Sequence, residues 1–207
     1  MSPRAAGLGS AALWVLLLAP AGWLLACTFG DRLGANPVEA LLLDTGRWAL
    51  RLLLLTLAAT PLRRWTGWNL LRVHRRRLGL AAAAYALLHV LVYAVLDQGL
   101  FWPQLLADLL KRPFITAGMA AFVLLLPLVA TSSGGAMRHL GPRRWQLLHR
   151  LVYAATALVL LHFWWMVKAD TREPAVYVLV FALLLAARWA GSGRRHLRRP
   201  DVRRKPC

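Results

Sequence analysis

The sequence is divided into long apolar blocks by short breaks that are rich in arginine. About 20 apolar residues, at about 1.5 Å each, cross the roughly 30 Å hydrocarbon core of a bilayer as a helix. Hydrophobic residues make up 59% of the 207, and the mean hydropathy is +0.52. We therefore predict an all-α integral membrane protein, a six-transmembrane helical bundle forming one domain. The predicted spans are residues 11–29, 47–62, 78–96, 114–131, 147–167 and 174–190.

The strongly basic charge indicates how the chain is oriented. The net charge is +18, from 26 Lys and Arg against 8 Asp and Glu. In a soluble chain this balance would suggest nucleic acid, but here the basic residues lie at segment ends and one set of loops carries most of them. Basic loops stay in the cytoplasm, so we predict that both termini and the basic tail 191–207 are cytoplasmic. Segments 30–46, 97–113 and 168–173 would then be periplasmic, and no nucleic-acid partner is expected.

The cysteines exclude several kinds of cofactor site. Cys27 and Cys207 are the only two, so no CxxCH haem attachment or iron-sulfur set is available. Any iron cofactor must therefore be held by histidine. Leu24 to Cys27 resembles a lipoprotein or signal cleavage site, but we expect an uncleaved first helix because the apolar run is long for a signal peptide.

Three histidines lie within predicted spans and are candidate metal ligands: His89, His149 and His162. Thirteen residues separate His149 from His162, about 20 Å along a helix, so one iron cannot be bound by both. His89 is eight residues before Asp97, and His162 is six before Lys168, which places them within about 3 Å in depth. Such a pair can bind one haem from opposite faces. A polar contact between helices is the alternative for each histidine alone.

His149 lacks an equally good partner, so a second haem there stays an open alternative. His74, His139 and His196 lie in basic loops, where we expect solvated side chains.

Several stretches together resemble the MsrQ family, within the wider ferric reductase-like transmembrane proteins. They are GANPVE from Gly34, WALRLLLLTLAATPLRR from Trp48, RRRLGL before His89, KRPFITAGM from Lys111, RRWQLLHRLVY from Arg143 and HFWWMVKADTREP from His162. The resemblance implies a haem b cytochrome of the bacterial inner membrane, with His89, His149 and His162 as its ligand set. It also implies electron transport from the quinone pool, or from a cytosolic flavin reductase, to a periplasmic molybdenum-containing methionine sulfoxide reductase. FMN, as in a flavoprotein, is suggested by the resemblance alone.

The chain departs from the wider group in two ways. Its third span lacks a second histidine on the cytoplasmic side, and no flavin and nicotinamide domain follows. Arg51 near the outside, and Arg77 and Arg150 near the inside, could bind haem propionates or a quinone headgroup, because guanidinium pairs with carboxylate in a bidentate way. Ordinary positive-inside arginines are the alternative for Arg77 and Arg150.

The sequence indicates an electron carrier without catalytic residues of its own. No segment outside the predicted spans is long enough for a soluble substrate pocket, so we expect transfer to another protein. The acidic residues of the two outer loops should form the docking surface: Asp31, Glu39, Asp44, Asp97 and Asp108. Three alternatives stay open: a cytochrome b for another acceptor such as ferric iron, a transporter whose intramembrane histidines relay protons, and a haem-free assembly subunit.

Overall fold

The computed structural model describes residues 3–67 and 70–196, and this part of the chain contains helices and no strand. The prediction of an all-α protein is therefore confirmed. The elements in order are α1 (Pro3–Phe29), α2 (Pro37–Thr66), α3 (Leu70–Leu91), the π-helix η1 (Val92–Asp97), α4 (Trp102–Lys111), α5 (Pro113–Ala130), α6 (Gly134–Leu148), α7 (Leu151–Met166) and α8 (Arg172–His196).

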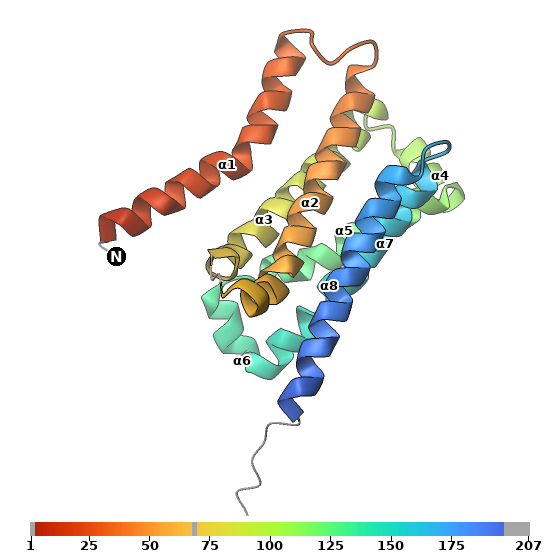
Figure 1. The fold of residues 1–207 in the computed structure, drawn as a ribbon. Helices are drawn as coiled ribbons and strands as arrows, with labels where there is room; N and C mark the ends of the chain where they lie inside the picture. Colours follow the sequence, from red (N-terminus) through yellow and green to blue (C-terminus); the bar gives the residue numbers. More distant parts are fainter. Residues whose placement is uncertain (1–2, 68–69, 197–207) are drawn as a thin grey trace, which may run out of the picture.

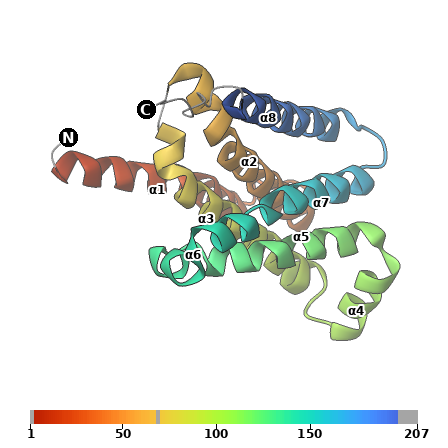
Figure 2. The same ribbon diagram turned by 90° about the horizontal axis from the view of Figure 1, so that it is seen from below.

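The long helices form a bundle with α2 near its middle (Figure 1). Helix α2 packs most extensively against α3, and α5 packs against α7, while α8 contacts both α2 and α7. Seen along the bundle, α8, α2 and α7 form one side, and α5 and α4 lie toward the other (Figure 2). One end of the bundle carries the turn before α2, helix α4 and the turn before α8, and we call it the histidine end. The opposite end carries residues 63–67, 70–77 and 131–150, with Arg188 of α8 beside Arg64, and we call it the arginine end.

Four helical segments are long and apolar enough to cross a membrane: Ala12–Phe29, Val73–Asp97, Pro113–Ala130 and Arg172–Ala190. A fifth is obtained if α6 and α7, which meet at an angle of 42°, count as one span. A multi-pass membrane protein is thus confirmed, while six spans and two cytoplasmic termini stay predictions. Helix α2 is the predicted span not in this set, because Arg47 and Arg51 make it less apolar.

Helix α2 is nonetheless the centre of the core. It contributes Leu50, Leu52, Leu53, Leu54 and Leu57, each at most 6% exposed, and it begins ten residues before the predicted span. Its start follows from local chemistry, since the Asn36 side chain accepts a hydrogen bond from the Glu39 backbone N–H and Pro37 occupies the first turn.

Two helices lie where we predicted only loops. Helix α6 is a basic, exposed helix interrupted at Gly141, whose φ of 74° takes it out of helical geometry. Helix α4 exposes Trp102, Leu106 and Leu110, one turn apart, while Asp108 on its inner side is 3% exposed. Apolar side chains facing out and a carboxylate facing in suit a helix that lies in the membrane interface.

Helix α1 is bent, and its first half leans away from the bundle (Figure 1). Pro20 lies inside the helix and lacks the N–H that would continue the backbone ladder. The Tyr85 hydroxyl enters the helix next to it, donating to the Leu17 carbonyl and accepting from the Ala21 N–H, both at 2.9 Å. A side chain inserted into the ladder beside a proline explains the bend.

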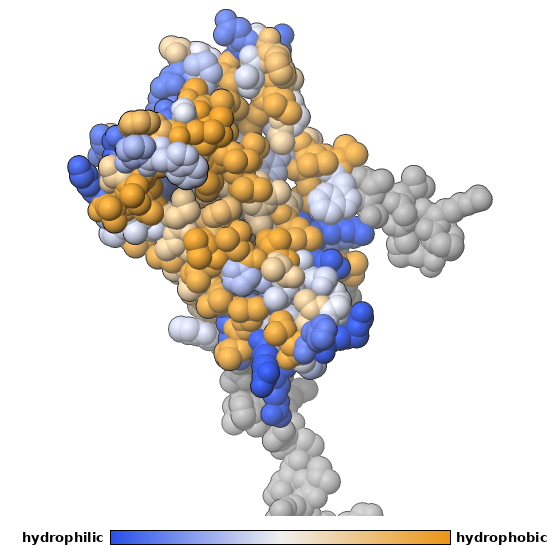
Figure 3. Space-filling model, turned by 180° about the vertical axis from the view of Figure 1, so that it is seen from behind, coloured by the Kyte–Doolittle hydropathy of each residue, from blue (hydrophilic) through white to orange (hydrophobic). Residues whose placement is uncertain are grey.

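The surface of the bundle matches a membrane environment. On the face shown in Figure 3, apolar side chains cover the middle and hydrophilic residues gather at the two ends. Leu87, Val123 and Leu183 are large, exposed apolar residues within the segments that are long enough to cross a membrane. A contiguous apolar belt of this kind is expected of a surface that contacts lipid.

Candidate functional site

His89 and His162 face each other inside the bundle, toward the histidine end. His89 is on α3 and His162 is on α7, and their ring centroids are 6.1 Å apart with an interplanar angle of 82°. The predicted pairing of these two histidines therefore agrees with their positions. Both rings are only partly accessible, within an apolar part of the bundle.

Backbone carbonyls hold both imidazoles in one tautomer. His89 Nδ1 donates to the Leu42 carbonyl at 3.0 Å, and His162 Nδ1 donates to the Phe114 carbonyl at 2.6 Å. A carbonyl oxygen can only accept, so Nδ1 carries the hydrogen in each ring and Nε2 keeps its lone pair. This is the arrangement of metal-ligating histidines, whose second nitrogen is fixed by a hydrogen bond.

Two glycines make room for the rings. A Cβ added at Gly118 on α5 would lie 2.8 Å from His162 Nδ1, and one at Gly46 on α2 would lie 3.2 Å from His89 Nδ1. Each imidazole therefore packs directly on the backbone of a neighbouring helix. Any other residue at these positions would push the ring toward its partner or break its hydrogen bond to the carbonyl.

A cavity of about 270 Å³ lies between the helices at these rings. Most of its wall is apolar, and its polar lining consists of the two histidines, Tyr93, Arg47, Asp97 and Arg112. The π-helix η1 continues α3 past His89, so that residues 89, 93 and 97 all reach the cavity. Such π-turns are frequent at functional sites.

The residues fit a haem. Within the described residues no group of three or more His, Cys, Asp or Glu side chains could hold a metal ion, and His89 and His162 are two imidazoles that face each other. A porphyrin would supply the other ligands that an iron held by two histidines needs. Two imidazoles that both bound one metal ion, with metal–nitrogen bonds of about 2 Å, would have ring centres about 6 Å apart, which matches the observed 6.1 Å between His89 and His162.

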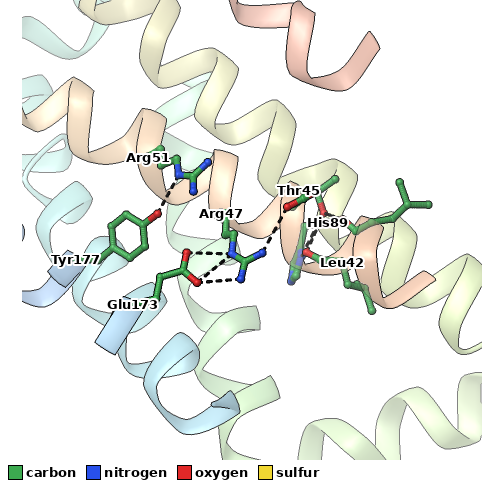
Figure 4. A network of polar contacts seen from close by, with 9 residues as sticks. Leu42, Thr45, Arg47, Arg51, His89, Glu173 and Tyr177 are labelled. Carbon is green, nitrogen blue, oxygen red and sulfur yellow. Dashed lines mark hydrogen bonds and ion pairs between the residues drawn. The ribbon is translucent and has the colours of Figure 1, made fainter. Parts of the chain in front are cut away.

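Ion pairs surround the outer rim of the cavity. Arg47 contacts Glu173 of α8 at 2.9 Å (Figure 4). It also contacts Asp44 at 3.5 Å. On the other side, Asp108 accepts hydrogen bonds from the Tyr93 hydroxyl and the Gln104 amide, both at 2.9 Å, and pairs with Arg112 at 3.1 Å. The two arginines on the rim are therefore each matched by carboxylates.

Arg51, predicted near the outside, does not line the cavity, and Arg77 and Arg150, predicted near the inside, lie at the arginine end. Arg51 points to α8, where its Nε donates to the Tyr177 hydroxyl at 2.9 Å, and its guanidinium lies 5.3 Å from the Trp48 ring (Figure 4). Arg77 lies 3.3 Å from His74 on the same helix, and Arg150 is exposed at the junction of α6 and α7. Arg47 and Arg112 are the arginines that line the cavity instead.

His149 lies apart from the pair, at the arginine end. Its ring stacks on Trp145 at 3.9 Å, and its Nδ1 donates to the Trp145 carbonyl at 3.1 Å. Its neighbours include the positive charge of Arg75 rather than a second imidazole. His139 is exposed, and the side chain of His196 lies outside the described residues.

Comparison with known proteins shows which family the chain is similar to. Residues 45–160 match the family described as ferric reductase like transmembrane component. The chain is 48% identical over 188 residues to the protein-methionine-sulfoxide reductase heme-binding subunit MsrQ of Ralstonia nicotianae, with 89% of this chain and 87% of the relative covered. The protein of the same name from Rhodospirillum rubrum is 47% identical over 188 residues, covering 91% and 90%. No solved structure matches the chain.

Proposed function

Because the chain belongs to the MsrQ family of ferric reductase-like transmembrane proteins, we propose that it is a haem b cytochrome of the bacterial inner membrane. In this proposal it carries electrons to a periplasmic, molybdenum-containing methionine sulfoxide reductase, for repair of oxidised periplasmic proteins. The chain is the electron-transfer subunit and the partner holds the site of sulfoxide chemistry.

The observation that carries the proposal is the pair His89 and His162, with ring centroids 6.1 Å apart and both Nδ1 atoms bound to carbonyls. These residues would be the two axial ligands. When bound, the haem supplies one-electron redox chemistry within the membrane. The protein excludes water with an apolar wall, and the carbonyls of Leu42 and Phe114 hold the rings in the orientation that bis-imidazole ligation needs.

His89 and His162 would hold the haem toward the end of the bundle from which electrons leave. His89 and His162 are in the half that carries α4 and the turn before α8, which positive-inside orientation puts on the periplasmic side. Arg112 and Arg47 line the cavity at this side, so they replace Arg51 as the candidates for pairing with propionates. Guanidinium groups suit that role because they bind carboxylates with two parallel hydrogen bonds.

The donor is proposed at the arginine end, which faces the cytoplasmic side in this orientation. Reduced quinone from the bilayer, or a cytosolic flavin reductase, would supply the electrons there. His149 is the candidate ligand of a second haem, and Arg77 and Arg150 are candidates for contact with a quinone headgroup or a second haem. FMN rests on the family resemblance alone.

Two of the proposed docking carboxylates are engaged within the protein. Asp108 is 3% exposed and bonded to Tyr93, Gln104 and Arg112, and Asp44 contacts Arg47. Asp97 is exposed, and its carboxylate bonds only to the neighbouring Gln98 among the described residues. The proposed contact for a partner therefore consists of Asp97 and the turn before α2. A small contact area and a dependence on salt are typical of transient electron-transfer complexes.

An absorbance and redox measurement tests the proposal. The chain is produced with sufficient haem, purified and reduced, and we expect a low-spin Soret and α band. His89→Ala and His162→Ala should each lose most of this haem, because one axial bond is removed. His149→Ala is the matched control, and should keep the low-spin signal of the pair while changing only the amount of any second haem.

The alternatives predict other results. A proton-relay transporter or a haem-free assembly subunit gives a colourless, folded protein, which would overturn the proposal. A haem protein that is oxidised by ferric iron but not by the periplasmic reductase with methionine sulfoxide would indicate a different acceptor. Reoxidation by free methionine sulfoxide without a partner would show that the chain has an active site of its own.

A further inference from the structure

The arginine end gathers cations from several helices without a carboxylate. Arg64 of α2 reaches α8, where its Nη1 lies 3.4 Å from the Arg188 carbonyl, and the Arg188 guanidinium lies 5.3 Å from the Tyr153 ring of α7. Arg75 of α3 is half-buried and its charge interacts with that of Arg188. Every acidic side chain in the described part of the chain lies on elements of the other half, so no described carboxylate compensates these charges.

An apolar groove begins beside these arginines. It has a volume of about 560 Å³ and runs between α2 and α8, lined by Trp65, Val180, Leu183, Leu184 and Ala187, together with two further alanines of α8. Arg64 and Arg188 are next in sequence to Trp65 and Ala187, and the Arg64 guanidinium reaches the α8 backbone at Arg188. These two arginines therefore lie beside the lining of the groove.

We propose that this groove is a binding site for an anionic phospholipid. Its acyl chain would lie along Trp65 and the apolar face of α8, and its phosphate would lie at Arg64 and Arg188, with Arg75 adding positive potential from α3. Basic pockets between transmembrane helices at the cytoplasmic side are suited to lipid headgroups with negative charge. Guanidinium binds the oxygens of a phosphate in the same bidentate way as a carboxylate.

Orientation alone does not explain the arrangement. Arginines that only obey the positive-inside rule can extend into water, as the exposed Arg63 and Arg76 do. Arg188 instead lies over a tyrosine ring, and Arg64 turns toward α8. Holding like charges together beside an apolar groove is unfavourable without an anion, and a phospholipid supplies both the anion and the chain that fills the groove.

Native mass spectrometry of the detergent-purified, full-length chain tests the site. The protein is titrated with dioleoyl phosphatidylglycerol and, separately, with dioleoyl phosphatidylcholine. We expect the anionic lipid to be retained at lower concentration. Arg64→Gln and Arg188→Gln should each weaken its retention about fivefold relative to the neutral lipid, which is the contribution of about one basic residue at a membrane surface. Ala187→Phe, which fills the groove, should weaken retention with the arginines intact.

Arg76→Gln is the matched control, because it removes the same charge from an exposed position of the same end. It should leave retention unchanged, and thermal unfolding checks that each variant is folded. Equal retention of the two lipids by the parental chain, or an equal loss in Arg76→Gln, would overturn the proposal. Displacement of the lipid by millimolar inorganic phosphate would show a simple anion site without a role for the groove, and would overturn it as well.

Discussion

At the histidine end each arginine of the cavity rim lies beside a carboxylate, whereas at the arginine end the cations lie beside one another. Arg47 contacts Glu173 and Asp44, and Arg112 contacts Asp108. At the other end, Arg75 interacts with Arg188, and no described acidic residue is near either. The two ends therefore differ in how charge is compensated, although both are rich in arginine.

The difference separates two roles of charge in one small membrane protein. Matched pairs fix the positions of α2, α4, α5 and α8 around the cavity, so that the two imidazoles are held without help from a ligand. Unmatched charges set orientation across the membrane and leave a local positive potential. At the histidine end the protein's own contacts compensate the arginines, whereas at the arginine end the proposed lipid would supply the compensating charge.

The largest expected effect comes from filling the space behind His162. Gly118→Ala places a Cβ 2.8 Å from His162 Nδ1, closer than real Cβ contacts, so the ring or helix α5 must move. We expect the loss of most low-spin haem, measured by the Soret band per protein. Gly46→Ala, with its Cβ 3.2 Å from His89, should cause a smaller loss or a shifted midpoint potential.

Gly79→Ala is the control for this comparison, because its Cβ would meet Thr56 at an ordinary 3.7 Å. It should keep the haem, and replacing a helical glycine with alanine should not reduce the stability of α3. Full haem content in Gly118→Ala would mean that the rings are not closely packed on the backbone. It would contradict the conclusion that the protein holds the two imidazoles in place without a ligand.

A smaller effect is expected from Asp108→Asn. The substitution keeps the size of the side chain but removes the charge that faces Arg112, and it places an amide where Gln104 and Tyr93 now donate. Loss of one partner in a buried network costs about 1–3 kcal/mol, and thermal unfolding would measure it. Asp97→Asn, at an exposed carboxylate, should change stability by less than about 0.5 kcal/mol but slow oxidation by the proposed periplasmic partner.

The sequence was sufficient to predict that His89 and His162 lie at the same depth, because depth in a membrane follows from residue counting. Eight residues to Asp97 and six to Lys168 place His89 and His162 at one level, and the structure brings them together. Counting also separated His149 from His162. Asn36, Pro37 and Glu39 form a helix-start motif that could have predicted where α2 begins. The predicted span started ten residues later because its limits were taken from the apolar run alone.

The rest of the site depends on which helix faces which, and this is not contained in a single sequence. Arg47 and Arg51 are one turn apart on α2, and only the packing of α8 shows that Arg51 meets Tyr177 while Arg47 reaches the cavity. The need for glycine at positions 46 and 118 becomes clear only when the imidazoles of His89 and His162 are seen to pack against them. Asp108 was expected to be exposed because its helix was not predicted, and α4 turns its carboxylate inward.

The smallest expected effect is on stability. Removing one arginine from each end should change the free energy of unfolding in opposite directions. Arg47→Gln leaves Glu173 and Asp44 without their cation. Both side chains of the pair Arg47 and Glu173 are about one-third exposed, at 30% and 37%, so solvent screens it and we expect a loss of at most about 1 kcal/mol.

Arg75→Gln should have the opposite sign in a neutral detergent, because it removes one of two repelling charges and has no described carboxylate to leave behind. The unfolding temperature should stay equal or rise slightly, and the gain should fade as salt is added, since screening weakens interactions between accessible charges. Added phosphatidylglycerol should reverse the sign, because the parental chain would then gain more from the anion than the variant does. A clear loss of stability in neutral detergent would show that Arg75 has a compensating partner, and the contrast between the two ends would not hold.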